Sequence, residues 1–189
     1  MFEGILVDLV PYGKAFFERE HRWLNNESAF WGTAGDRLIV SRPQIERWQA
    51  DRQRNSGRPG EAIWFGMRTK SGVALGDITL AEILPHHRVA MIGIAIGEPD
   101  YWGGGYGTDA LLLIVEYAFN WLDFHKLWLS TMSTNRRMQR AAEKAGFHEE
   151  ARRRRFWYAD GQRVDDVMYG VLQDEWPGRD VLVDRLGLR

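Results

Sequence analysis

The sequence predicts an α+β fold in which a mixed, mostly antiparallel sheet carries helices on both faces. Two observations lead to this fold class. Between residues 62 and 97, three strand-like segments follow one another with only short turns between them, which is typical of an antiparallel meander. After residue 97, helical and strand-like segments alternate, as in folds where helices cover a sheet. The chain has no internal repeat and no long polar linker, so we expect a single domain over residues 1–189.

The first half of the chain begins with a strand over residues 4–10, followed by a helical stretch over residues 11–23. A second helix begins after Ser41, because Ser41 and Gln44 have the spacing of a capping box. This helix ends before the Gly- and Pro-containing segment 55–60. The three strands of the meander span residues 62–68, 73–83 and 89–97.

The second half opens with residues 108–122, which are apolar on nearly every side and predict a helix enclosed by other structure. A strand over residues 127–132 follows. The segment 135–145 carries one apolar stripe, and Gly146 stands where a left-handed C-terminal cap belongs. The last two strands, over residues 147–158 and 163–172, flank the hairpin signal Asp160-Gly161.

Composition excludes several classes of function. The chain has no cysteine, so it cannot use disulfides, a thiolate nucleophile, iron–sulfur ligation or a cysteine-type zinc site. Its 25 basic and 26 acidic residues leave a net charge of −1, without the global positive field of a nucleic-acid binder. No apolar run approaches the roughly 18 residues of a membrane span. We expect a soluble cytoplasmic protein with no metal, since His86-His87 lacks a third ligand at suitable spacing.

The segment 101–108, Tyr-Trp-Gly-Gly-Gly-Tyr-Gly-Thr, lies between a predicted strand and a predicted helix. Such a junction points successive backbone N–H groups at an anion, and the helix dipole adds to the attraction. The alternative is a tight turn that needs positive φ angles. The dinucleotide fingerprint G-x-G-x-x-G does not fit, because Thr108 stands where it requires Gly or Ala. The segment therefore predicts a phosphate or pyrophosphate site.

Three segments resemble one family in the right order. Residues 89–110, VAMIGIAIGEPDYWGGGYGTDA, resemble the acetyl-CoA-binding strand, loop and helix of the GNAT acetyltransferases, in the branch of the ribosomal-protein N-terminal acetyltransferases RimJ and RimL. Residues 126–135, KLWLSTMSTN, with the helix that follows, are similar to the second motif of that branch. Residues 165–172, DDVMYGVL, followed by Glu175-Trp176, resemble its closing strand. The resemblance covers residues 76–176.

The resemblance implies a GNAT-like fold in which two parallel strands, 89–97 and 127–133, splay apart and hold acetyl-CoA between them. The pantetheine arm then binds strand backbone, and the pyrophosphate binds the N–H groups of the glycine-rich loop. Asn135 matches the position whose amide holds the pantetheine, and it also suits a helix N-cap. The implied cofactor-binding residues are Ile94, Ile96, Trp102, Gly103, Gly104, Gly105, Tyr106, Gly107, Thr108 and Asn135.

The proton-handling positions of the family are not filled. Met91 stands where many relatives have glutamate, Ala142 where some have a tyrosine acid, and Met138 where the branch has serine. Acetyl transfer is still feasible, since much of the rate can come from positioning and from N–H groups aimed at the oxyanion. Glu82 and His87 are then candidate bases, and Ser133 is a candidate acid for the thiolate leaving group. For each of them the alternative is an exposed polar residue at a strand end.

The sequence thus predicts an N-acetyltransferase that moves acetyl from acetyl-CoA to a primary amine by direct attack in a ternary complex. The acceptor is a protein N-terminus or a small amine. One alternative is an acyl-CoA-binding or regulatory module that has lost catalysis; another is an RNA-associated protein that uses the arginine run 152–155. A strand would divide that run between two faces, so nucleic acid is not the expected partner. Homodimers are common in the branch, and nothing in the sequence locates an interface.

Overall fold

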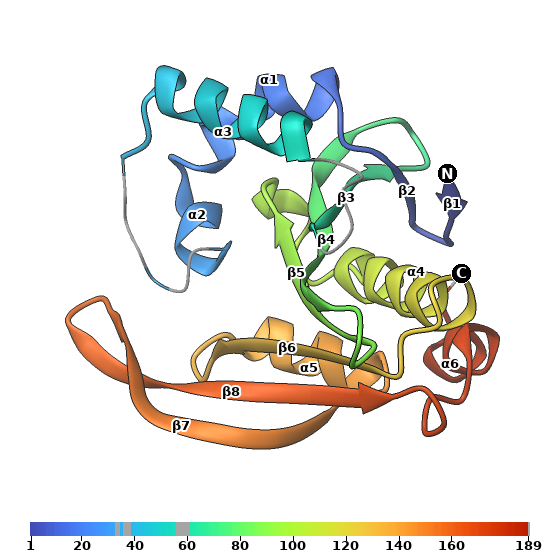
Figure 1. Ribbon diagram of the computed structural model, residues 1–189. Helices are drawn as coiled ribbons and strands as arrows, with labels where there is room; N and C mark the ends of the chain where they lie inside the picture. Colours follow the sequence, from blue (N-terminus) through green and yellow to red (C-terminus); the bar gives the residue numbers. More distant parts are fainter. Residues whose placement is uncertain (33–34, 36–38, 56–60, 189) are drawn as a thin grey trace.

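One eight-stranded sheet runs through the part of the chain that the computed structural model describes, which is residues 1–32, 35, 39–55 and 61–188 (Figure 1). Its order is β1-β2-β3-β4-β5-β6-β8-β7. The strands are β1 (Phe2–Glu3), β2 (Val7–Pro11), β3 (Ile63–Thr69), β4 (Ala74–Leu84), β5 (Val89–Ile96), β6 (Lys126–Met132), β7 (His148–Ala159) and β8 (Gln162–Leu172). The helices are α1 (Lys14–Trp23), α2 (Glu27–Gly32), α3 (Arg42–Asn55), η1 (Pro99–Tyr101), α4 (Tyr106–Asn120), α5 (Arg136–Lys144) and α6 (Arg179–Leu186).

Neighbouring strands are antiparallel except for β5 and β6, which are parallel. The predicted meander is present as β3, β4 and β5. This topology confirms the predicted mixed, mostly antiparallel sheet. The β7–β8 hairpin extends beyond the rest of the fold (Figure 1).

The larger core lies between the sheet and α4. Leu9, Ile78 and Leu80 are fully buried on this face, and α4 meets them with apolar residues on nearly every side, as predicted. The fully buried Ala142 on α5 and Leu182 on α6, 3% exposed, belong to the same cluster.

The opposite face carries a smaller core under α1. It consists of Val10, Phe16, Trp23 and Ala74. A Cβ on Gly66 of β3 would lie 2.2 Å from the Phe16 ring, so glycine is what allows α1 to approach the sheet there. Helices therefore cover both faces, as the sequence predicts.

Local signals placed several boundaries correctly. The Ser41 N–H donates to Gln44 Oε1 at 3.0 Å, which is the return bond of the predicted capping box at the start of α3. Gly146 has φ +94° directly after α5, as a left-handed cap requires. Asp160 and Gly161 both have positive φ, at 46° and 77°, which is the backbone of a type I′ hairpin turn.

Other boundaries differ from the sequence expectation. β2 begins at Val7 rather than residue 4, because the Gly4 N–H turns back to the Val7 carbonyl at 2.8 Å. α1 begins at Lys14 rather than residue 11, because Pro11 still pairs with Phe65 in the sheet. The short elements β1, α2 and α6 were not predicted at all.

Candidate functional site

The parallel strands β5 and β6 diverge along their length. They pair at three positions, Val89 with Lys126, Ala90 with Leu127 and Met91 with Trp128. Beyond these positions β5 continues to Ile96 and β6 to Met132 without pairing to each other, and Figure 1 shows the two strands moving apart. The predicted splayed pair is therefore present, and its closed end is at Met91 and Trp128.

A cavity of about 530 Å³ opens between the diverging strands. β5, β6, α2, α5 and the loop before α4 line it. Of the cofactor-binding residues that the sequence suggested, those in the lining are Ile94, Ile96, Trp102, Gly103, Gly105, Gly107, Thr108 and Asn135. Gly104 and Tyr106 belong to the same loop but lie outside this lining.

The glycine-rich loop reaches α4 through left-handed backbone. Gly103 and Gly105 have φ values of +82° and +89°, which residues with a side chain rarely adopt. Gly105 is the N-cap residue of α4, and no side chain caps the helix there. The N–H groups of the first turn are thus available to an anion beside the helix dipole.

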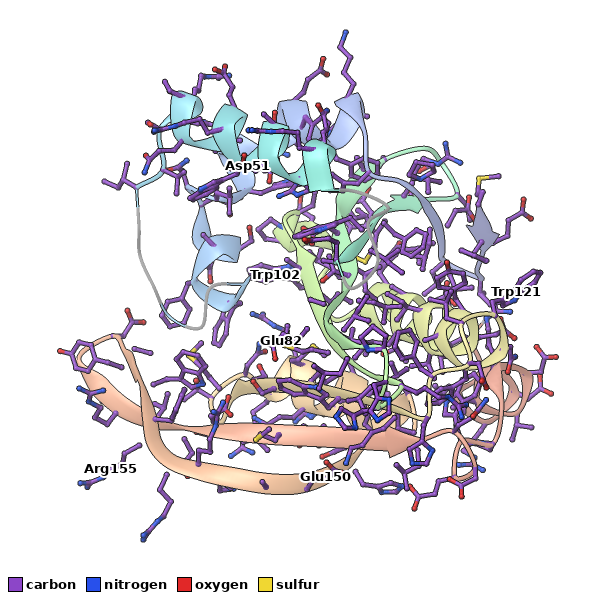
Figure 2. The ribbon with its side chains drawn as sticks, in the orientation of Figure 1. Asp51, Glu82, Trp102, Trp121, Glu150 and Arg155 are labelled. Atoms are coloured by element: carbon purple, nitrogen blue, oxygen red, sulfur yellow. The ribbon has the colours of Figure 1, made fainter. Side chains whose placement is uncertain are left out.

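Three basic residues of α5 also line the cavity, at positions i, i+3 and i+7 of one helical face: Arg137, Arg140 and Lys144. The Arg137 guanidinium lies 4.2 Å from the Trp102 ring centre and 5.1 Å from that of Trp31. The Trp102 Nε1–H in turn donates to the Ile96 carbonyl at 2.9 Å, and Figure 2 shows Trp102 between α2 and β5. No Asp or Glu among the described residues lines the cavity, so it favours a ligand with several negative charges.

Sequence reasoning missed these α5 cations. Their helical spacing, on a helix that starts at the end of a splayed strand, is the signal that could have found them. Asn135 occupies the N-cap position, where its Oδ1 accepts the Met138 N–H at 3.2 Å.

The three positions at which the family carries proton-handling groups stay apolar in the structure. Met91 and Met138 line the cavity, and Ala142 is fully buried. None of these side chains can take or give a proton.

The candidate catalytic residues Glu82, His87 and Ser133 do not line the cavity. Glu82 is exposed, has φ +46° and sits at a β-bulge, next to the residue that pairs with Met91 (Figure 2). His87 is exposed in the β4–β5 turn. The Ser133 hydroxyl accepts the Asp165 N–H at 3.2 Å, which ties the end of β6 to β8.

A cluster of ionisable side chains lies on the face of the sheet under α1 and α3. Arg52 of α3 donates to Glu20 Oε1 of α1 at 2.9 Å, and its guanidinium lies 4.2 Å from the Trp64 ring centre and 4.9 Å from that of Tyr12. Asp77 of β4 lies beside this group. Burial raises the pKa of Asp77 to about 7, Arg52 opposes that rise and Glu20 adds to it.

Burial, together with Asp77 and Glu20, also raises the pKa of the Tyr12 hydroxyl above its ordinary value. This tyrosine is therefore protonated throughout the neutral range. This cluster could not be predicted from the sequence, since its members are spread from Tyr12, just after β2, to the middle of β4.

The arginine run on β7 is partly occupied by ion pairs. Arg152 pairs with Glu149 at 3.0 Å, and Arg153 pairs at 2.8 Å with Asp166, which is fully buried. Figure 2 shows Arg155 on the outer side of the hairpin, and Arg155 is not among the residues that line the cavity.

Within residues 1–32, 35, 39–55 and 61–188, no three or more His, Cys, Asp or Glu side chains are grouped so that they could hold a metal ion. Across the same ranges, no helix has the length and apolar character needed to cross a membrane.

Several curated proteins with related sequences are N-acetyltransferases by name. The chain is 31% identical over 107 residues to YdaF of Bacillus subtilis, whose name places it provisionally with the ribosomal N-acetyltransferases; the match covers 57% of this chain and 58% of that protein. It is 30% identical over 105 residues to the spermidine N(1)-acetyltransferase of Escherichia coli K12, covering 56% of each. The chain thus spans less than two thirds of the length of these relatives.

Solved structures of acetyltransferases have the same fold as this chain. The structure of the spermidine N-acetyltransferase from Vibrio cholerae in complex with CoA and spermine superposes with a TM-score of 0.79 at 20% identity, over 90% of this chain and 97% of that one. Residues 9–148, well over half of the chain, match the model of the acetyltransferase (GNAT) domain. The protein is therefore a member of the GNAT acetyltransferase family.

Proposed function

We propose that this protein transfers the acetyl group of acetyl-CoA to a primary amine. The observation that carries the proposal is the cavity between β5 and β6, which begins where their pairing stops at Met91 and Trp128 and ends at the glycine loop before α4. A pyrophosphate held at the loop and a thioester held between the two strands would occupy one continuous cavity.

The residues present fit acetyl-CoA. The α4 N-terminus offers backbone N–H groups to the pyrophosphate, and the α5 cations Arg137, Arg140 and Lys144 supply charge for the remaining phosphate. Unpaired backbone along β5 offers partners to the amides of the pantetheine arm, in the manner of an added strand. Acetyl-CoA supplies the activated thioester.

The proposed reaction is direct. The amine nitrogen attacks the thioester carbonyl, a C–N bond forms, the C–S bond breaks, and the oxyanion that develops is stabilised by N–H groups of the strand. None of the 189 residues is a cysteine, so no cysteine thiol carries the acetyl group between the two substrates. Ser133 remains the candidate acid for the thiolate; Glu82 and His87 remain the sequence-derived candidates for the base.

The acceptor is a protein N-terminus or a small amine. Similarity to YdaF supports the first class, together with the RimJ/RimL-like branch that the sequence motifs suggest, and similarity to spermidine acetyltransferases supports the second. Of the elements before residue 76, α2 lines the cavity through Ser28, Trp31 and Gly32. This helix lies outside the segment with the strongest family resemblance.

Calorimetric titration with acetyl-CoA tests the cofactor half of the proposal. Gly103→Glu places a carboxylate at the anion site. Gly72→Glu is the matched control, because Gly72 has a similar left-handed φ (+90°, against +82° at Gly103) and an added Cβ has no neighbour within 4 Å at either position. We expect saturable binding to the wild type and Gly72→Glu and none to Gly103→Glu. Absence of binding to the wild type would contradict the proposal.

Release of free CoA, followed by thiol detection, tests the transfer. The acceptors are spermidine, single amino acids and peptides with a free N-terminus. A second candidate function, an acyl-CoA-binding module without catalysis, is favoured by Met91, Ala142 and Met138 at the proton-handling positions of the family. That candidate predicts binding of acetyl-CoA and no release of CoA with any amine.

A further inference from the structure

Asp77 lies one strand away from the cavity. In the antiparallel ladder it is opposite Ala95 of β5 and opposite Gly66 of β3. Opposite residues in such a ladder share a face and have Cα atoms about 5 Å apart. Ala95 lines the cavity and Asp77 does not. The Asp77 side chain lies beside Ala95, on the face of the sheet that α1 and α3 cover.

The same face of β5 presents Met91, Gly93 and Ala95 to the cavity. Their partners on β4 are Ala81, Thr79 and Asp77, in that order. Of these three partners only the aspartate can exchange a proton. Asp77 is therefore the one ionisable side chain among the β4 partners of these three cavity-lining residues.

Burial and the groups around Asp77 shift the pKa of its carboxyl to about 7, and none of these groups forms a hydrogen bond with it among the described residues. The groups that face it are Tyr12 after β2, Glu20 of α1 and Arg52 of α3, while β3 and β5 place uncharged residues opposite. Arg52 is held by Glu20 and stacks on Trp64. No side chain among the described residues donates a hydrogen bond to the Asp77 carboxylate. A pKa of about 7 is the value that a general base needs at neutral pH.

We propose that Asp77 is the catalytic base that takes the proton of the acceptor amine, in place of the missing carboxylate at Met91. This inference rests on the proposed acetyl transfer. The bound ammonium gives one proton to Asp77, the neutral amine then attacks the thioester, and the second proton lost by nitrogen goes to the CoA thiolate. Asp77 returns its proton to water after each turnover, so the step balances.

The experiment compares pH profiles of kcat/KM for CoA release between pH 5 and 9, with the acceptor among spermidine and N-terminal peptides that the wild type uses fastest. We expect the wild-type profile to fall below pH 7. Asp77→Asn should lower kcat about 100-fold or more and remove that fall, with unchanged acetyl-CoA affinity. Asp8→Asn is the matched control, since Asp8 is a buried carboxylate on the same face of the sheet, paired with Lys70 and outside the cavity.

Two further variants test the assignment without removing Asp77, which also protects the test if Asp77→Asn fails to fold. Arg52 lowers the pKa of Asp77 and Glu20 raises it. Arg52→Gln should therefore move the fall in the profile to higher pH, and Glu20→Gln should move it to lower pH. Asp77→Glu should restore part of the rate. A purely structural role for Asp77 predicts none of these opposite shifts.

The possible failures are distinguishable. An active wild type whose profile survives Asp77→Asn overturns the role of Asp77 and leaves the acetyl transfer standing. Loss of the fall in Glu82→Gln or His87→Gln instead assigns the base to that residue and has the same effect. A wild type that releases no CoA with any amine overturns the proposed function, and the role of Asp77 with it.

Discussion

The guanidinium of Arg137 lies 4.2 Å from the centre of the Trp102 ring, so the first turn of α5 touches the glycine loop across the mouth of the cavity. This contact holds a permanent positive charge next to the N-terminus of α4. Cation and helix dipole then act on the same part of a bound ligand.

Replacing Arg137 should weaken the binding of acetyl-CoA and leave the stability of the fold unchanged. We expect Arg137→Gln to lower acetyl-CoA affinity about tenfold, because one charge-assisted hydrogen bond to a phosphate is lost. Calorimetric titration at two salt concentrations measures it, and the variant should show the smaller salt dependence. Arg163→Gln is the control, since Arg163 stacks on Tyr158 in the distant hairpin. Equal losses in both variants would contradict a role at the cavity.

Asp109 of α4 should be a stability residue. It is fully buried, and its Oδ2 accepts the N–H groups of Leu6 and Val7 at 2.7 and 3.0 Å. Asp109→Ala should lower the free energy of unfolding by about 2–4 kcal/mol, because two buried donors lose a charged acceptor. Urea denaturation measures the loss. Asp51→Ala, at the exposed ion pair with Arg54 within α3, should change stability by less than about 1 kcal/mol.

Asp77 should make stability fall as pH rises. Burial raises its pKa from 3.8 to about 7. Between these two pH values the folded state keeps a proton that the unfolded chain has released. The full effect is no more than about 4 kcal/mol, less what solvent screens at this partly exposed carboxylate. We therefore expect Asp77→Asn to melt higher than wild type at pH 8 and to lose that advantage at pH 4.5.

Thermal melting across that range, with Asp8→Asn as the control, measures the pH effect. A variant of Asp77 that gains nothing at pH 8 would show that the carboxyl is not protonated preferentially in the folded protein.

Any side chain at Gly146 should lower the stability of the fold. Its φ of +94° is left-handed, and an added Cβ would lie 3.1 Å from Trp176 Cδ1. We expect Gly146→Ala to destabilise the fold by about 1–2 kcal/mol. The control is Gly161→Ala, which has a similar left-handed φ and open space, so the difference in unfolding midpoint between the two isolates the contact with Trp176.

Features with a local cause were predictable from the sequence. The cap at Gly146, the turn at Asp160-Gly161 and the N-cap at Asn135 each depend on a few adjacent residues. α2 was missed because it is only six residues long and is held by tertiary contacts: the Ser28 hydroxyl donates to the Trp23 carbonyl at 3.0 Å, and a Cβ on Gly32 would touch that of Ala95.

The candidate site also contains one part that the sequence predicts and one part that it does not. The glycine loop could be predicted, because a contiguous segment carries the whole anion site. The Asp77 cluster could not be, since Tyr12, Glu20 and Arg52 come from three separate elements and meet Asp77 only after the sheet has formed under α1 and α3. Charge that acts across packed elements leaves no periodic trace in the sequence.

Because β5 and β6 pair at only three positions, the sheet contains unpaired backbone groups between them. Beyond Met91 and Trp128 the two strand edges face each other, and a ligand that hydrogen-bonds to one of them satisfies some of these groups. A ligand that binds only the folded chain stabilises it in proportion to the logarithm of its concentration. The amount of intact protein should then follow the acetyl-CoA supply, so that a shortage of the acetyl donor would limit both the reaction and the lifetime of the protein.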